Sequence, residues 1–388
     1  MSDLGPIPLS PKKKDSSTST ALRRLRVLAG HFPQLSQPPT TGGQHQLSQI
    51  SVSPTSGGGG GDESRPHVEL SKRQAEAHNA VRWPNVYENF TRSGYAPSSL
   101  RHTRKYTGLE KLNQALRWVA TAANTQGNKR EVQATVHSGG LVASSNRESG
   151  DIAAHVHGAL QNPDERARTP REKRHLARIH KHLLDEEGYA AFRKKLVSEI
   201  GERRGALPRG ASWEDAEQQA PGILDAIRRG VVGLHQDPKS EALTVIPSTE
   251  SGESSTHAEQ SIYEDIGTRR EEVTGATRHA LGVGSGRPLI LPVAGTKRPC
   301  NVCHEVEHEA TREGLFSGPF SLLRTSATPG LAYDKRQYLA KSAFARPEEQ
   351  AREVVKRFQT SPKQLPTQAQ RHWRLDQAAD SDSEDEDG

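Results

Sequence analysis

The stretch Pro299-Cys300-Asn301-Val302-Cys303 contains both cysteines of the 388-residue chain and stands at the start of a helix predicted over 301–313. The positive end of a helix dipole lowers the pKa of a thiol placed there, so both sulfurs are suited to bind a metal as thiolates. Two thiolates cannot complete a tetrahedral zinc site. A third protein ligand is needed, and an open catalytic site then leaves the fourth position to water.

The segment that offers the third ligand is Thr256-His257-Ala258-Glu259-Gln260, which also begins a predicted helix. His257 can complete a His/Cys/Cys set with Cys300 and Cys303. Glu259 projects about 200° around the helix from His257, so it is placed to exchange a proton with metal-bound water rather than to bind the metal. A His-x-Glu segment followed by Pro-Cys-x-x-Cys is the arrangement of zinc-dependent deaminases.

On these motifs the chain resembles the cytidine deaminase-like superfamily, in particular the divergent deaminase domains of bacterial toxins and secreted effectors. The residues that carry the resemblance are His257, Ala258 and Glu259, and then Pro299, Cys300 and Cys303. The resemblance implies a zinc ion held by His257, Cys300 and Cys303, with Glu259 as the catalytic proton carrier. It also implies hydrolytic deamination of a cytosine-like, or less readily an adenine-like, base in a nucleotide or in single- or double-stranded nucleic acid. For a toxin, it implies an inhibitor protein as a partner.

Residues 132–143 predict a β-hairpin upstream of these motifs. Its first strand, 132–137, alternates apolar and polar residues, Ser138-Gly139-Gly140 forms a turn, and 141–143 is a second short strand. The hairpin resembles the first two strands of the deaminase-like family, where an Asn often contacts the sugar of the substrate. Asn146, which follows the second strand, is therefore the expected substrate-binding residue.

The sequence departs from the family pattern in two places. The stretch between Asn146 and His257 is much longer than the usual first helix of the family. After the cysteine helix, one strand is predicted at 320–325, where the family usually has two. The first departure predicts a large insertion.

The pattern as a whole predicts an α/β fold with a deaminase-like mixed β-sheet covered by helices, a large helical insertion and disordered termini. Besides the hairpin, the sequence predicts strands at 243–246 and 289–294 and helices at 109–123, 334–344 and 347–358. The predicted domains are a disordered polar leader over 1–66, a helical region over 67–130, a deaminase-like domain over 131–346 with its insertion at 151–240, and a C-terminal helix with a disordered acidic tail over 347–388.

Composition restricts the class of protein. The chain has 53 Lys and Arg against 47 Asp and Glu, and its last nine residues hold six acids and no base, so the remainder is clearly basic. A basic body favours a polyanionic partner such as nucleic acid. No stretch approaches the roughly 18 apolar residues of a membrane span, and the N-terminus lacks a signal peptide. We therefore expect a soluble protein with no membrane partner, in the cytoplasm or delivered by a route that needs no signal peptide.

Two other functions remain open on the sequence. His304-Glu305-Val306-Glu307-His308 matches the His-Glu-x-x-His pattern of zinc metalloproteases, in which the two histidines share a helix face and Glu305 would be the base. That helix is charged nearly throughout, and no clear third ligand follows it. The cysteines also fit a structural zinc, in which case the chain would be a non-enzymatic, zinc-stabilised interaction protein.

Overall fold

The computed structural model of the chain describes a defined set of residues: 65–71, 74–75, 78–79, 106–124, 131–146, 152–247, 250–251, 254–312, 316, 318–323, 330 and 336–359. All of them belong to one unit of the chain, Gly58–Gly388. Residues 1–64 of the predicted disordered leader and the predicted acidic tail from 360 onward lie outside the described residues.

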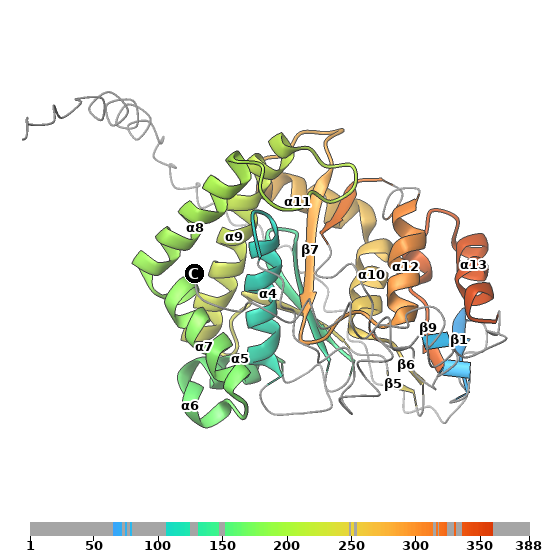
Figure 1. The fold of residues 1–388 in the computed structure, drawn as a ribbon, viewed down its shortest axis with the longest axis horizontal. Helices are drawn as coiled ribbons and strands as arrows, with labels where there is room; N and C mark the ends of the chain where they lie inside the picture. The colour runs from blue at the N-terminus through green and yellow to red at the C-terminus, as the bar shows by residue number, and fades with distance from the viewer. Residues whose placement is uncertain are drawn as a thin grey trace, which may run out of the picture. The chain divides into compact units, whose positions relative to one another are not determined.

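A mixed five-stranded sheet with the order β4-β3-β2-β7-β8 lies between layers of helices (Figure 1). β2 (Val132–His137) and β3 (Gly140–Ser145) form the predicted hairpin and pair antiparallel along their whole length. Ser138 and Gly139 between them have φ values of 52° and 77°. Left-handed backbone at both central positions is what a tight two-residue hairpin turn requires. β4 (Leu243–Ile246) extends the sheet parallel to β3.

β7 (Leu289–Gly295) is a central strand, and the chain runs from its end to Cys300. As far as Pro292 it pairs parallel with β8 (Phe320–Leu323), whereas its last three residues pair antiparallel with β2. Proline cannot donate a hydrogen bond to a ladder. Pro292 is tolerated here because it lies directly before the first residue of β7 that pairs with β2.

One face of the sheet is covered by α4 (Glu110–Ala123) and by helices of the region 151–240. That region contains α5 (Ile152–Gln161), α6 (Pro163–Arg166), α7 (Pro170–Ile179), the π-helical turn η3 (His180–Leu184), α8 (Glu186–Gly201) and α9 (Trp213–Gln236). One apolar core joins these helices to the sheet; it includes Leu116, Trp118, Ile223, Ile227, Val132 and Ile290. Residues of the predicted insertion therefore supply part of the layer that covers the sheet.

The opposite face is covered by the helices that carry the metal-ligand motifs. They are α10 (Ala258–Thr268), α11 (Arg270–Leu281), α12 (Asn301–Arg312) and α13 (Pro347–Gln359). Leu289 and Leu291 of β7 belong to this second core, whereas Ile290 and Ala294 belong to the first, as the alternation of side chains along a strand requires. The predicted α/β fold with a mixed sheet covered by helices is confirmed. Among the described residues, no helix is both long and apolar enough to cross a membrane.

A second, smaller sheet corrects two predictions made from the sequence. It has the order β1-β9-β6-β5 and is built from β1 (His67–Glu69), β9 (Arg336–Tyr338), β6 (Ser254–Ser255) and β5 (Glu250–Ser251). The helix predicted over 334–344 is wrong, because that segment pairs with β1 as a strand and then forms a short 3-10 turn, η4 (Lys341–Ala343). The predicted helical region 67–130 likewise begins with a strand. Short strands of this kind depend on partners far away in sequence, which a local pattern does not reveal.

Candidate metal centre

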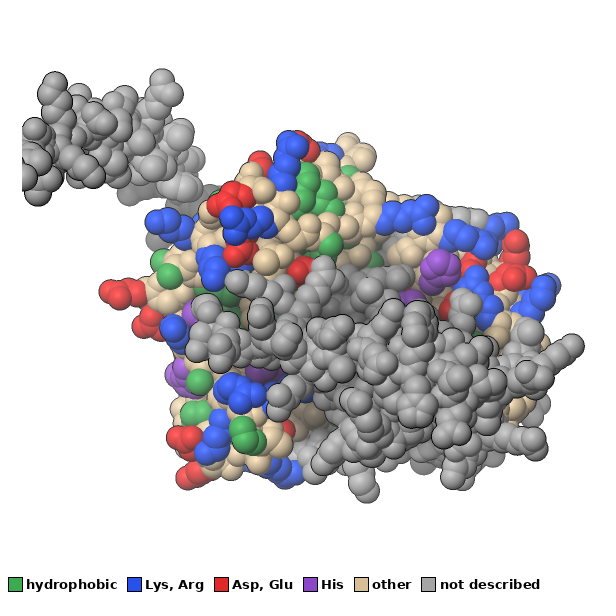
Figure 2. Space-filling view, in the orientation of Figure 1, with side chains coloured by type: hydrophobic (Ala, Val, Ile, Leu, Met, Phe, Trp, Pro, Cys, Tyr) green, Lys and Arg blue, Asp and Glu red, His purple; other side chains and the backbone are tan. Residues whose placement is uncertain are grey.

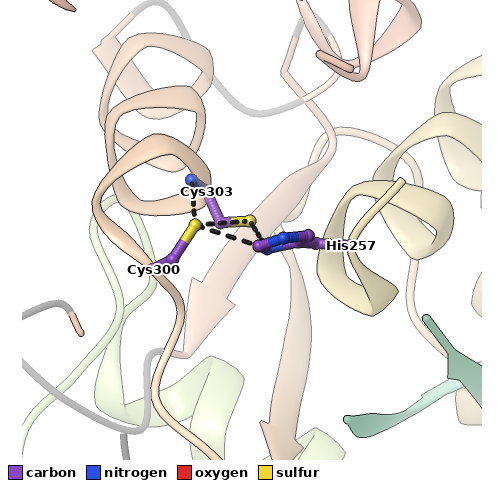
Figure 3. Close-up of side chains that lie close together, drawn as sticks. All are labelled: His257, Cys300 and Cys303. Atoms are coloured by element: carbon purple, nitrogen blue, oxygen red, sulfur yellow. Dashed lines mark hydrogen bonds between the residues drawn. The ribbon is translucent and has the colours of Figure 1, made fainter. Parts of the chain in front are cut away.

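The starts of α10 and α12 bring three metal-binding side chains together. His257 is the N-cap of α10, Cys300 directly precedes α12, and Cys303 lies in its first turn. The Sγ atoms of Cys300 and Cys303 lie 3.3 and 3.5 Å from Nδ1 of His257, and 3.5 Å from each other. Figure 3 shows the three side chains pointing toward one another from the two helix ends. Their ligand atoms form a buried group that can hold a metal ion.

The protonation of these groups follows from their mutual contacts. Burial lowers the pKa of His257, but the neighbouring Cys300 outweighs it and raises the pKa to about 9. Burial raises the pKa of the Cys300 thiol, but hydrogen bonds with Cys303 and the charge of His257 bring it well below its usual range. Burial and the Cys300 thiolate raise the pKa of Cys303. Because a metal takes neutral histidine and thiolates, its binding would displace protons from His257 and Cys303.

Glu259 lies beside this group without belonging to it. Its side chain is fully buried, its Oε1 accepts a 2.9 Å hydrogen bond from Nε2 of Gln133, and its Oε2 lies 3.8 Å from Sγ of Cys303. Burial raises the pKa of this carboxyl, and the charges of Glu131 and Cys300 raise it further. A buried carboxyl with a raised pKa is suited to holding and releasing a proton near neutral pH.

Two residues at the start of β2 complete the surroundings of Glu259, and the sequence pattern did not single them out. Carboxylate oxygens of Glu131 and Glu259 and a ring nitrogen of His257 lie within 4.8 Å of one another. Nε2 of Gln133 lies 3.4 Å from both Oε1 of Glu131 and the carbonyl oxygen of Lys297. The alternating pattern predicted that Gln133 faces solvent, but β2 is buried on both faces. The polar positions of the strand thus face the site.

Space for the Gln133 amide comes from a glycine on the neighbouring strand. Gln133 is the register partner of Gly295 in β7. A Cβ at position 295 would lie 2.2 Å from Cδ and Oε1 of Gln133, far inside van der Waals contact. The amide that donates to Glu259 therefore occupies the volume that any other residue at 295 would fill.

Gln337 of β9 is a further contact of the metal-binding group. Its Oε1 lies 3.2 Å from Sγ of Cys300, and its side chain is buried. A half-turn of the amide would present Nε2 to the same sulfur, and an N–H donor of this kind stabilises a thiolate ligand. The second sheet thereby positions a polar side chain next to the metal ligands.

Asn146 lies at the end of the hairpin next to the strand that carries Glu131. Its Oδ1 accepts a 2.9 Å hydrogen bond from the backbone N–H of Glu131, and its own N–H donates to the Glu131 carbonyl at 3.1 Å. Asn146 thus fixes the backbone from which the Glu131 side chain reaches the site. The expected contact of Asn146 with a substrate sugar stays a prediction.

The His-Glu-x-x-His segment is placed differently from the metal group. Glu305 and Glu309 both pair with Arg357 of α13, each at 2.5 Å. His308 is exposed. Within the described part of the chain, the groups whose ligand atoms converge on a metal position contain neither His304 nor His308.

Comparisons of this chain with protein-family models, with curated proteins and with solved structures found no match. The chemistry of the site is therefore argued from its own residues. Two cysteines and one histidine can bind a metal ion, and a buried acid that is not one of these three ligands can move protons beside it.

Proposed function

We propose that this protein is a zinc-dependent hydrolytic deaminase that acts on a cytosine-like base, and less readily on an adenine-like base, of a nucleotide or nucleic acid. The observation that carries the proposal is the convergence of His257, Cys300 and Cys303 with a fully buried Glu259 beside them. Zinc-dependent deaminases use this set, a His/Cys/Cys site and a Glu that is not a ligand.

The donor set fits zinc. A tetrahedral zinc ion with bonds of about 2.3 Å to sulfur and about 2.0 Å to nitrogen separates its ligand atoms by about 3.8 Å (S to S) and about 3.5 Å (S to N). The observed separations are 3.5 Å between the sulfurs and 3.3 and 3.5 Å from sulfur to Nδ1. The three side chains would need to move by only a few tenths of an ångström to bind this metal, and three protein ligands leave one position open, as catalytic zinc sites do.

The reaction replaces the exocyclic amino group of the base by an oxygen from water and releases ammonia. Zinc, when bound, supplies a Lewis acid that makes water nucleophilic near neutral pH. Glu259 takes the proton that the attacking water loses, delivers it to the ring nitrogen of the base, and assists departure of the amine as ammonia. Gln133 holds the Glu259 carboxyl in place through its 2.9 Å hydrogen bond.

The nature of the substrate and the biological setting rest on weaker support. The excess of basic residues favours a phosphate-bearing substrate over a free base. A role as a toxin or secreted effector, with an inhibitor protein as its partner, is supported only by the resemblance of the two motifs to such domains.

The test follows ammonia release by the full-length protein from cytidine, a cytidine nucleotide, and single- and double-stranded nucleic acids. We expect activity that a chelator removes and added zinc restores. His257→Ala should lose both zinc and activity. His279→Ala, a matched change of an exposed histidine on α11, should keep both.

Several outcomes would contradict the proposal. Zinc-loaded protein that releases no ammonia from any of these substrates would favour the non-enzymatic, zinc-stabilised alternative. Peptide cleavage that Glu305→Gln abolishes would favour the metalloprotease. Deamination that survives His257→Ala would exclude the metal centre as its source.

A further inference from the structure

A group of arginines lies close to the proposed catalytic site, where α4 meets the loop that leads to Cys300. Asn113 of α4 donates a 2.9 Å hydrogen bond to the carbonyl oxygen of Leu323, the last residue of β8. β8 runs parallel to β7, so this part of α4 lies at the edge of the sheet where β7 ends. Arg117 follows Asn113 by one helical turn, on the same side of α4. Arg298 lies in the loop after β7, two residues before Cys300.

Arg117 is the most deeply placed of these arginines. Its side chain is only 5% exposed, its Nη1 donates a 2.9 Å hydrogen bond to the hydroxyl of Tyr106, and its Nε is buried without a hydrogen-bond partner. A buried guanidinium is normally paired with an acid or fully hydrogen-bonded. Among the ion pairs of the described residues, none joins Arg117 to a carboxylate.

The neighbouring charges have the same sign as Arg117. Burial lowers the pKa of Arg171 in α7 to about 10, and the charge of Arg117 lowers it further than any other group does. Burial also lowers the pKa of Arg298, and the charge of Arg117 acts in the same direction. Glu172 has only a minor opposing effect on Arg171. The three guanidinium groups are therefore close enough to repel one another.

His175, which packs among the same groups, responds to this field. Burial lowers its pKa to about 2, and the positive charges of Arg117 and Arg171 act next in size. Its Nδ1 lies 2.8 Å from the hydroxyl of Thr121, which in turn donates to the carbonyl oxygen of Arg117. His175 thus stays neutral and adds no acid to balance the arginines.

This concentration of positive charge differs from the surface of the protein. On the face shown in Figure 2, basic and acidic side chains lie intermixed. Several exposed arginines are moreover paired with acids, as Arg193 is with Asp225 and Arg346 is with Glu349. Like charges held together at low exposure destabilise a fold unless an anion relieves them.

We propose that Arg117, Arg171 and Arg298 form a binding site for a phosphate group of the substrate, adjacent to the metal centre. Guanidinium groups bind phosphate oxygens in pairs, and partial burial strengthens each such hydrogen bond. A phosphate held here would anchor a nucleotide or a nucleic-acid strand whose base enters the site of Glu259. The phosphate site rests on the proposed function for the identity of its ligand, but its existence can be tested without catalysis.

The test measures binding of a short fluorescent single-stranded oligodeoxynucleotide to the full-length protein by anisotropy, over a range of salt concentrations. Each phosphate contact that is lost should reduce the slope of log K against log salt by about 0.7. We expect this reduction for Arg117→Gln and, separately, for Arg171→Gln, whose side chain is only half-buried and whose replacement disturbs packing less. Arg352→Gln removes the same charge from an exposed position of α13 and should leave the slope unchanged.

Competition distinguishes the two sources of the phosphate. A cytidine nucleotide should displace the oligonucleotide better than cytidine does, and this advantage should shrink in Arg117→Gln. If the variants weaken binding of the nucleotide and of inorganic phosphate but not of the strand, the site takes the phosphate of a mononucleotide. If folded Arg117→Gln and Arg171→Gln proteins bind every probe as Arg352→Gln does, the phosphate site is wrong. A reduced slope in a protein that releases no ammonia would keep the phosphate site and reject the deaminase.

Discussion

Replacing Gly295 by alanine tests whether the Gln133 amide positions Glu259. The added Cβ would lie 2.2 Å from Cδ and Oε1 of Gln133, whereas carbon atoms in contact prefer about 3.5–4.0 Å. The amide must therefore move by at least about 1 Å. Such a shift away from Glu259 would stretch the present 2.9 Å hydrogen bond beyond its useful range of about 3.2 Å.

The expected cost follows from overpacking. Inserting a methyl group into a closely packed interior costs about 1–3 kcal/mol, so Gly295→Ala should reduce the free energy of unfolding by that amount. Gly284→Ala is the matched control, because a Cβ at position 284 would meet no atom within 4 Å and Gly284 has no positive φ. The control should be unchanged or more stable by up to about 1 kcal/mol. Denaturant unfolding measures both.

A double-mutant cycle locates the clash. In a Gln133→Ala background the obstructing side chain is gone, so Gly295→Ala should cost nothing. Ammonia release should fall in Gly295→Ala and in Gln133→Ala, but less than in a protein that lacks the Glu259 carboxyl. Wild-type stability and activity in Gly295→Ala would refute the role assigned to Gln133, as would an equal cost in both backgrounds.

Three further predictions concern stability and metal content. Burial lowers the pKa of His137 to about 4, against about 6.5 in an unfolded chain, so the unfolded state binds the proton first and stability should fall by about 1.4 kcal/mol for each unit that the pH drops between these values; His137→Gln should flatten that part of a stability–pH curve. Cys303→Ser should lose zinc by elemental analysis and lower the melting temperature, because metal binding is coupled to folding. Arg357→Gln leaves the buried Glu309 carboxylate with less compensation and should cost about 3 kcal/mol in denaturant unfolding, while Arg352→Gln on the same helix should cost nothing measurable.

The sequence predicted the parts of the fold that depend on local patterns. The hairpin over 132–143 and the buried strand over 289–294 are present, because alternation, turn residues and apolar runs act over short distances. The convergence of His257 with Cys300 and Cys303 was also predicted, since residues of these types serve few purposes besides metal binding when two motifs occur together.

What the sequence did not reveal depends on contacts between distant segments. Gln133 looked like the solvent-facing side of a strand, because nothing local shows that helices cover both faces of the sheet. Gln337 was placed in a predicted helix, whereas it pairs opposite Val68 in a strand of the second sheet and reaches Cys300. Glu131 carries no motif at all. Its role follows only from the position of β2 beside the starts of α10 and α12.

The central claim is that Glu259 moves protons beside a metal that it does not bind. The most direct measurement compares ammonia release by wild-type protein and Glu259→Gln at equal, measured zinc content, with Glu271→Gln as an exposed control on α11. Glutamine keeps the shape of the side chain but cannot carry a proton. We expect unchanged zinc and a fall in rate of about 10² to 10⁴-fold. Deamination by Glu259→Gln at the wild-type rate would contradict the claim.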